Sequence, residues 1–255
     1  MSDGIRAPLR RALEARLDLG FGLAGPWPTL GVEELARRPV RTGSGDDAVL
    51  GDFFDLSGTP GATLRFEGDL GLADRLGAGL SVGTVVVDGR VGDDVGIGMS
   101  GGAIVVHGDA DARAGGAAAD ARRGMSGGEL VIRGSAAEDP GMRMRRGLVV
   151  ITGDVARRAG PGMIAGTVIV FGTPGPGPGL WSKRGSIVAM GTVEIPPTYR
   201  AACTYQPAHL RVTLLGLRRR YGLPVDERYL TGFYRRYSGD LAELGRGEIL
   251  AWTAA

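Results

Sequence analysis

Short apolar runs recur along the middle of the chain, each bounded by glycines. Six copies follow one another closely, and a looser copy, GATLRFEG, begins before them at Gly61. A repeat period of about 20 residues predicts a chain built from stacked, repeated coils. The six copies are GTVVVDG (83–89), GAIVVHG (102–108), GELVIRG (128–134), GLVVITG (147–153), GTVIVFG (166–172) and GSIVAMG (185–191).

Alignment on the glycines produces columns of like residues. Three or four aliphatic residues between glycines predict one short buried strand per coil. The three strand columns are Val85, Ile104, Leu130, Val149, Val168, Ile187; Val86, Val105, Val131, Val150, Ile169, Val188; and Val87, Val106, Ile132, Ile151, Val170, Ala189. A fourth column predicts an internal ladder on a second side of the coil: Leu80, Met99, Met125, Met144, Met163, Ser182.

These columns predict a mainly β fold, a parallel β-helix of about seven rungs and roughly 30 Å in length. A leucine-rich repeat has an overlapping period but needs an L-x-x-L-x-L pattern, which is absent. The second interval, from Gly102 to Gly128, is longer than the others and predicts a loop bulging from one rung. The chain divides into a non-repetitive N-terminal cover (1–60), the β-helix (61–195) and a partly helical C-terminal arm (196–255).

The flanking segments contain weaker signals. TLGVEELARRP predicts a short helix with Thr29 as a candidate N-cap and Pro39 as its stop. EIPPTYRAACTYQP has too much proline for a strand, and PAHLRVTLLGLRRRYGLP predicts a helix or packed arm ended by Gly222 and Pro224. In the last stretch, aromatic residues at helical spacings beside arginines are typical of a tail that packs on another protein or back on the stack, or of a small local core. These aromatics are Tyr229, Phe233, Tyr234 and Tyr237.

Composition limits the class of protein. No apolar run approaches the roughly 18 residues needed to span a bilayer, and the N-terminus lacks the apolar core of a secretory signal. The single cysteine, Cys203, excludes an intramolecular disulfide framework and suits a reducing cytosol. We therefore expect a cytoplasmic protein.

Catalytic and metal-binding patterns are missing from the sequence. His107 and His209 lie far apart, one cysteine cannot ligate an iron–sulfur cluster, and no cluster has zinc spacing. There is no G-x-S-x-G elbow and no P-loop, and the glycines of GDDVGIGMSGG do not stand between a strand and a crossover helix. We expect no catalytic residue and no metal site in this chain.

Basic pairs are the best candidates for a binding site. The net charge is only +2, but residues 141–190 hold seven basic groups against one acid, Asp154. Such asymmetry predicts a surface for an anionic ligand or an acidic subunit, with a plain solvated face as the alternative; the acidic first half argues against nucleic acid. Arginine suits carboxylates because its planar fork binds them bidentately. The pairs are Arg122–Arg123, Arg145–Arg146, Arg157–Arg158 and Lys183–Arg184.

The repeat with its GIGMSGG and RGMSGG corners resembles a specific family, the C subunits of formylmethanofuran dehydrogenase and, more closely, of the formyltransferase/hydrolase complex of methylotrophic bacteria. Three stretches favour these C subunits over the related C-terminal domain of glutamate synthase. They are LEARLDL followed by GVEELARRPV, then GDFFDLSG, and the closing YRRYSGDLAELGRGEILAW. The right-handed sense of the β-helix is implied by this resemblance.

The resemblance implies a non-catalytic scaffold subunit in one-carbon metabolism and formaldehyde oxidation. The complex moves a formyl group from a tetrahydromethanopterin carrier, via a methanofuran-type polyglutamylated cofactor, to formate. The implied partners are a formyltransferase-like subunit, an amidohydrolase-like hydrolase subunit and a further subunit, with no nucleic acid and no membrane. The polyglutamate tail becomes a candidate ligand for the basic residues Arg145, Arg146, Arg157, Arg158, Lys183 and Arg184. Two alternatives stay open: the C-type subunit of a molybdenum or tungsten formylmethanofuran dehydrogenase, and a glutamate-synthase-type domain.

Overall fold

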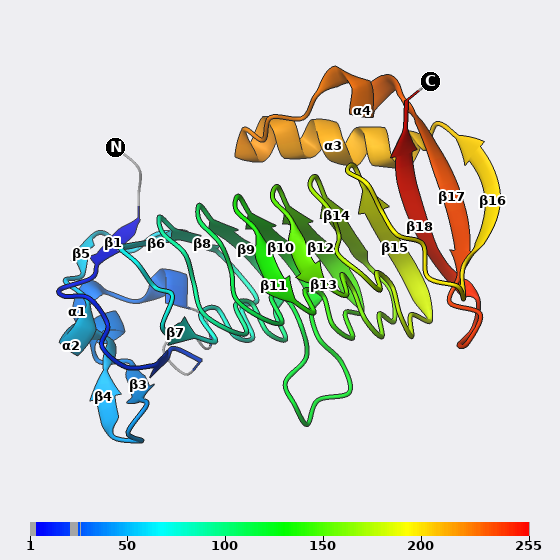
Figure 1. Cartoon of the computed structure of the whole chain (residues 1–255). Coiled ribbons are helices and arrows are strands. Elements are labelled where there is room, and N and C mark those ends of the chain that lie inside the picture. Colours follow the sequence, from blue (N-terminus) through cyan, green and yellow to red (C-terminus); the bar gives the residue numbers. More distant parts are fainter. Residues whose placement is uncertain (1–3, 21–24, 26, 255) are drawn as a thin grey trace.

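A computed structural model describes residues 4–20, 25 and 27–254. The protein is mainly β, with one 12-stranded, mostly parallel sheet and few helices (Figure 1). Nine strands of this sheet run parallel to their neighbours. In spatial order they are β1 (Ile5–Pro8), β6 (Thr63–Glu67), β8 (Thr84–Val87), β9 (Ser100–Val106), β10 (Ser126–Ile132), β12 (Arg146–Ile151), β14 (Thr167–Val170), β15 (Arg184–Ala189) and β18 (Arg246–Thr253).

The register of these strands is the one that the glycine alignment predicts. Val85 pairs with Ile104, Ile104 with Leu130, and Leu130 with Val149. A second line of parallel contacts joins Leu70, Val91, Ala110 and Ala136, and continues where β11 (Ala136–Glu138) pairs with β13 (Val155–Arg157). Each turn of the chain therefore contacts the next on two sides, and the turns stack along one axis (Figure 1).

Burial distinguishes the strand columns. The first and third columns are at most 2% exposed and belong to the interior of the stack, and so does the predicted ladder from Leu80 through Met163 to Ser182. The middle column faces outward instead. Its members Val105, Val131, Val150, Ile169 and Val188 form a second apolar cluster with the leucines of a helix, α3 (Ala208–Tyr221).

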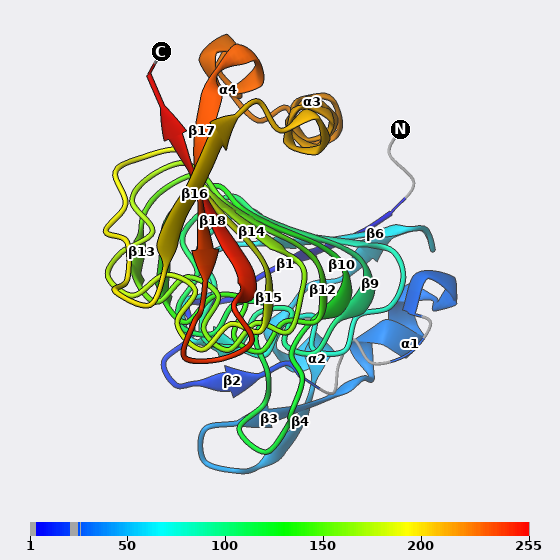
Figure 2. The ribbon, with the colours of Figure 1, turned by 90° about the vertical axis from the view of Figure 1, so that its right-hand side faces the viewer.

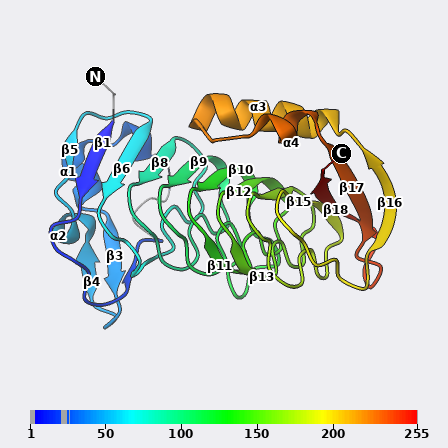
Figure 3. The same cartoon turned by 45° about the horizontal axis from the view of Figure 1, so that its top comes forward.

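Helix α3 runs along the outside of the stack, as the views from the end and from above show (Figures 2 and 3). Leu210, Leu214 and Leu217 are its buried residues. It ends, as predicted, at Gly222, which adopts a left-handed conformation with φ +61°. A short helix, α4 (Glu227–Thr231), follows and adds Tyr229 and Leu230 to the same cluster.

One prediction for the C-terminal arm is wrong. The proline-rich stretch contains a strand, β16 (Arg200–Tyr205), because its prolines at 196, 197 and 207 lie outside the paired residues. The aromatic residues, which the sequence shows at helical spacings, are divided between α4, which contains Tyr229, and β17 (Phe233–Gly239). Its aromatic spacing also fits an alternating strand, and antiparallel pairing with β16 and β18 decides the outcome.

The N-terminal segment lies at the opposite end of the stack (Figure 1). Strand β1 pairs with β6 and so covers the first copy of the repeat. The predicted helix is present, but it begins after Gly31, while Thr29 lies in the preceding 3-10 turn, so Thr29 is not its cap. The elements here are β2 (Leu17–Asp18), η1 (Trp27–Thr29), α1 (Val32–Ala36), β3 (Pro39–Thr42), β4 (Asp47–Val49), α2 (Leu50–Phe53), β5 (Ser57–Gly58) and β7 (Ala73–Asp74).

The predicted loop between the second and third close copies is present. A Cβ on Gly124 would lie 2.7 Å from the carbonyl carbon of Gly116, so the two glycines are in contact. Residues 117–123 leave the stack and return to it, and they form the green loop below the coils in Figure 1. This excursion accounts for the extra length of the interval from Gly102 to Gly128.

Candidate functional site

Five basic side chains share one corner of the stack, where the chain enters each strand. Arg146 begins β12, Arg184 begins β15, and Arg145 and Lys183 directly precede them. Arg246 begins β18 and pairs in register with Arg184. All five are exposed, and the structure records no ion-pair partner for any of them among the described residues. We call this group the basic corner.

Register determines the spacing within the basic corner. Arg184 and Arg246 are neighbours across one strand spacing, about 4.8 Å, and Arg146 lies two spacings from Arg184, about 10 Å away. Exposed like charges at such distances are only partly screened at ordinary ionic strength, where the Debye length is about 8–10 Å. The corner therefore presents a local positive field to an anionic ligand.

Arg157 and Arg158 lie away from the basic corner, at the end of β13 in the second line of strand contacts. Arg158 donates two hydrogen bonds to the Asp139 carboxylate, at 2.6 and 2.8 Å, and these bonds raise the pKa of Arg158. Arg157 lies 3.7 Å from Glu138. Both arginines therefore have carboxylate partners, and the structure does not join them with the other four predicted residues in one stripe.

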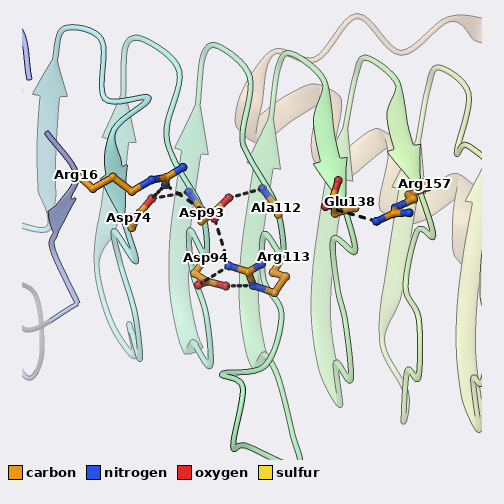
Figure 4. A network of polar contacts seen from close by, with 8 residues as sticks. All are labelled: Arg16, Asp74, Asp93, Asp94, Ala112, Arg113, Glu138 and Arg157. Atoms are coloured by element: carbon orange, nitrogen blue, oxygen red, sulfur yellow. Dashed lines mark hydrogen bonds and ion pairs between the residues drawn. The ribbon is translucent and has the colours of Figure 1, made fainter. Parts of the chain in front are cut away.

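The side of the stack that carries Arg157 and Arg158 holds a network of opposite charges (Figure 4). Arg113 donates to Asp94 at 2.7 and 2.9 Å, and Arg16 reaches Asp74 at 2.5 Å. The charges alternate along one column of equivalent positions, which holds Arg75, Asp94, Arg113, Asp139 and Arg158. Within this column, Asp94 binds Arg113 and Asp139 binds Arg158. Neighbouring coils thus neutralise one another here, so this side is less suited than the basic corner to an added anion.

The remaining candidate residues do not form a catalytic group. His107 lies 3.3 Å from Asp88, and partial burial, helped by Arg133, lowers its pKa so that the neutral form is favoured. His209 is on the exposed side of α3, and Cys203 is exposed on β16. Within the described ranges, no three His, Cys, Asp or Glu side chains are placed to hold a metal ion.

Arg246 is a member of the basic corner that the repeat pattern did not reveal. The sequence does contain a pattern that predicts this position. RGEILA (246–251) repeats the RGSIVA (184–189) of β15 and is a further copy without a closing glycine. The long intervening arm hides this copy from a search for a fixed period.

The stacked parallel sheet and the unpaired basic corner define a repeat protein with an anion-attracting surface. None of the helices in the described part of the chain is long and apolar enough to cross a membrane. No family model and no curated protein sequence matches the chain. Among solved structures, it is similar to a chain of the formyltransferase/hydrolase complex (FhcABCD) from Methylorubrum extorquens, determined by X-ray crystallography in complex with methylofuran.

This similarity extends over nearly the whole of both chains. The TM-score is 0.78 and the sequence identity is 33%, over 98% of this chain and 100% of the other. The protein belongs to the family of that chain of the formyltransferase/hydrolase complex.

Proposed function

We propose that this chain is the non-catalytic C-type scaffold subunit of a cytoplasmic formyltransferase/hydrolase complex, built as a right-handed parallel β-helix of about seven rungs. The observation that carries the proposal is the 33% identity over 98% of the chain to a component of such a complex. In this role the chain holds together the subunits that move a formyl group from a tetrahydromethanopterin carrier, via a methanofuran-type cofactor, to formate.

We propose the division 1–60, 61–195 and 196–255 as cover, β-helix and arm. In support, β1 pairs with the first coil at one end, and β18 pairs with the last coil at the other. Open sheet edges invite aggregation, so both ends of a coil stack need such covering strands.

The basic corner has a proposed role of its own, which is to bind the polyglutamate tail of the methanofuran-type cofactor. Arg145, Arg146, Lys183 and Arg184 are the predicted residues that support this role, and Arg246 joins them. Their charged groups have no carboxylate partner among the described residues, so they are free to bind carboxylates of a ligand. Arg157 and Arg158 would have to exchange their bonds to Glu138 and Asp139 to take part.

Isolation of the complex tests the scaffold role. The tagged chain is purified from its native host, and the co-purifying proteins and metals are identified by mass spectrometry. Formyltransferase-like and amidohydrolase-like subunits without molybdenum or tungsten are expected. A pterin-bound metal with iron–sulfur proteins would indicate the dehydrogenase instead, and glutaminase chemistry on a partner would indicate the glutamate-synthase-type alternative. If none of these partners appears, the proposed function is wrong.

Charge reversal tests the basic corner. In the complex, Arg145→Glu with Arg146→Glu should raise the KM for the polyglutamylated cofactor and reduce the salt dependence of formyl transfer. The matched control is Arg122→Glu with Arg123→Glu, which makes the same charge change in the loop 117–123. Equal KM values and salt responses in both variants and the wild type would refute tail binding. Loss of a subunit from the complex would assign the corner to docking of an acidic partner.

A further inference from the structure

One backbone position of the coil carries unexpected side chains in two of its copies. In five of the six close copies, the residue four positions before the opening glycine adopts a left-handed conformation, and in three of them it is a glycine, Gly79, Gly98 or Gly162, with φ near +65°. In the other two copies this position holds Arg143 and Trp181, with φ values of +53° and +61°. Left-handed backbone is costly for a bulky residue, and the coil does not need a side chain to make this turn.

Arg143 and Trp181 line one cavity of about 350 Å³, which we call the slot. Gly162 stands between them in the column and leaves the space open, since a Cβ there would meet only Cγ of Arg143, at 3.5 Å. Pro161 and the Asp139–Arg158 pair also line the slot. The two flanking positions are two coil spacings apart, about 9.6 Å.

The backbone around the slot is fixed. The N–H of Trp181 donates to Oδ2 of Asp240 at 2.8 Å, and Asp240 is only 1% exposed. The backbone N–H of Gly162 donates to the carbonyl oxygen of Leu180 at 2.7 Å, and the backbone N–H of Arg143 donates to the carbonyl oxygen of Pro161 at 2.9 Å. The side chain of Trp181 nevertheless stays 53% exposed. The uncovered indole therefore projects from a fixed backbone position and is available for contact with a ligand.

The charge of the slot selects among planar ligands. The Arg143 guanidinium donates a hydrogen bond to the carbonyl of Ala121, at 3.0 Å, and the structure records no carboxylate partner for it among the described residues. Arg158 and Asp139 neutralise each other. The slot therefore has a net positive charge beside an aromatic face, which disfavours cations and favours a flat ring that carries a negative charge.

We propose that the slot between Arg143 and Trp181 is a binding site for a planar aromatic carboxylate, with the ring against the indole and the carboxylate against the Arg143 guanidinium. The proposal rests on the geometry of this chain and does not depend on the proposed function. The slot lies on the same coils as Arg145 and Lys183 of the basic corner.

Titration of the full chain with 2-naphthoate tests the proposal. The indole N–H resonance of Trp181 in the ¹⁵N-labelled protein, assigned by its loss in Trp181→Gly, should shift saturably. 2-Naphthamide lacks the charge and cyclohexanecarboxylate lacks the flat ring, so both should bind at least several-fold more weakly. Arg143→Gly should weaken 2-naphthoate binding about tenfold, because it removes a charge-assisted hydrogen bond. Glycine is native to this column, so both variants should fold.

Arg122→Gly is the matched control, since it removes the same charge from the loop 117–123. It should leave binding unchanged. The proposal is overturned if the Trp181 resonance does not respond, if 2-naphthamide shifts it equally, or if Arg122→Gly weakens binding as much as Arg143→Gly. It is also overturned if the resonance moves only when partner subunits bind, because the slot is then a protein contact. None of these results changes which subunits co-purify with the chain.

Discussion

Replacement of Leu214 by alanine should strongly destabilise the protein. Leu214 is fully buried, in the outer apolar cluster that α3 shares with the middle strand column. Leucine-to-alanine changes at such sites cost about 2–5 kcal/mol, from lost burial and from the cavity that remains. Taking about 3 kcal/mol, and about 2–4 °C per kcal/mol for a chain of this size, the melting temperature should fall by about 6–12 °C.

Thermal and urea denaturation, followed by circular dichroism, would measure this effect. The control is Leu215→Ala, on the same helix one residue further along, where the side chain is 41% exposed. Its effect should stay within about 0.5 kcal/mol, since it leaves no cavity and alanine favours the helix. Equal losses in both variants, or no loss in Leu214→Ala, would show that α3 does not pack on the strands as described.

Two further predictions concern backbone and charge. Gly147→Ala should cost about 1–3 kcal/mol more than Gly79→Ala in urea denaturation. Both positions have positive φ, but only at Gly147 would the new Cβ clash, at 2.8 Å from the backbone carbonyl oxygen of Gly128. Burial, helped by Asp93, raises the pKa of Asp111 above 3.8, so stability falls as pH rises from 3.8 through that raised pKa. Asp111→Asn should therefore be the more stable protein at pH 7, and its advantage should disappear below about pH 4 in a pH series of melting curves; an advantage independent of pH would contradict this reasoning.

The coil stack could be predicted from the sequence because each coil repeats the same physical demand. A glycine at each corner and an aliphatic residue at each strand position fix the register, so the pairing of Val85 with Ile104 follows from alignment alone. The internal ladder of methionines was equally readable, since five large apolar residues recur at one position. Which strand column faced outward could not be read, because the middle column is as aliphatic as the inner two.

The arm and the site depended on contacts distant in sequence. Tyr234 is compatible with helix or strand by spacing, and only its pairing with Trp252 of β18 decides for strand. Likewise, the basic pairs were visible as a local pattern, but their partners were not. Arg158 is bound by Asp139 from the preceding coil, whereas Arg146 has no such acid one coil below it, where Ser126 stands. The runs of charge in the sequence therefore predicted which residues are candidates, but not which of them already bind an acidic side chain of a neighbouring coil.

The reach of α3 limits how the number of coils can change in evolution. The helix is about 21 Å long, and at its end Arg220 contacts Glu129 of β10 at 2.6 Å. A coil inserted or lost between β10 and β15 would displace Glu129 by about 4.8 Å from this contact. Coils ahead of β9 lie beyond the helix. Variation in length among relatives is therefore expected at the N-terminal end of the stack, while the segment from β10 to β15 keeps a constant count.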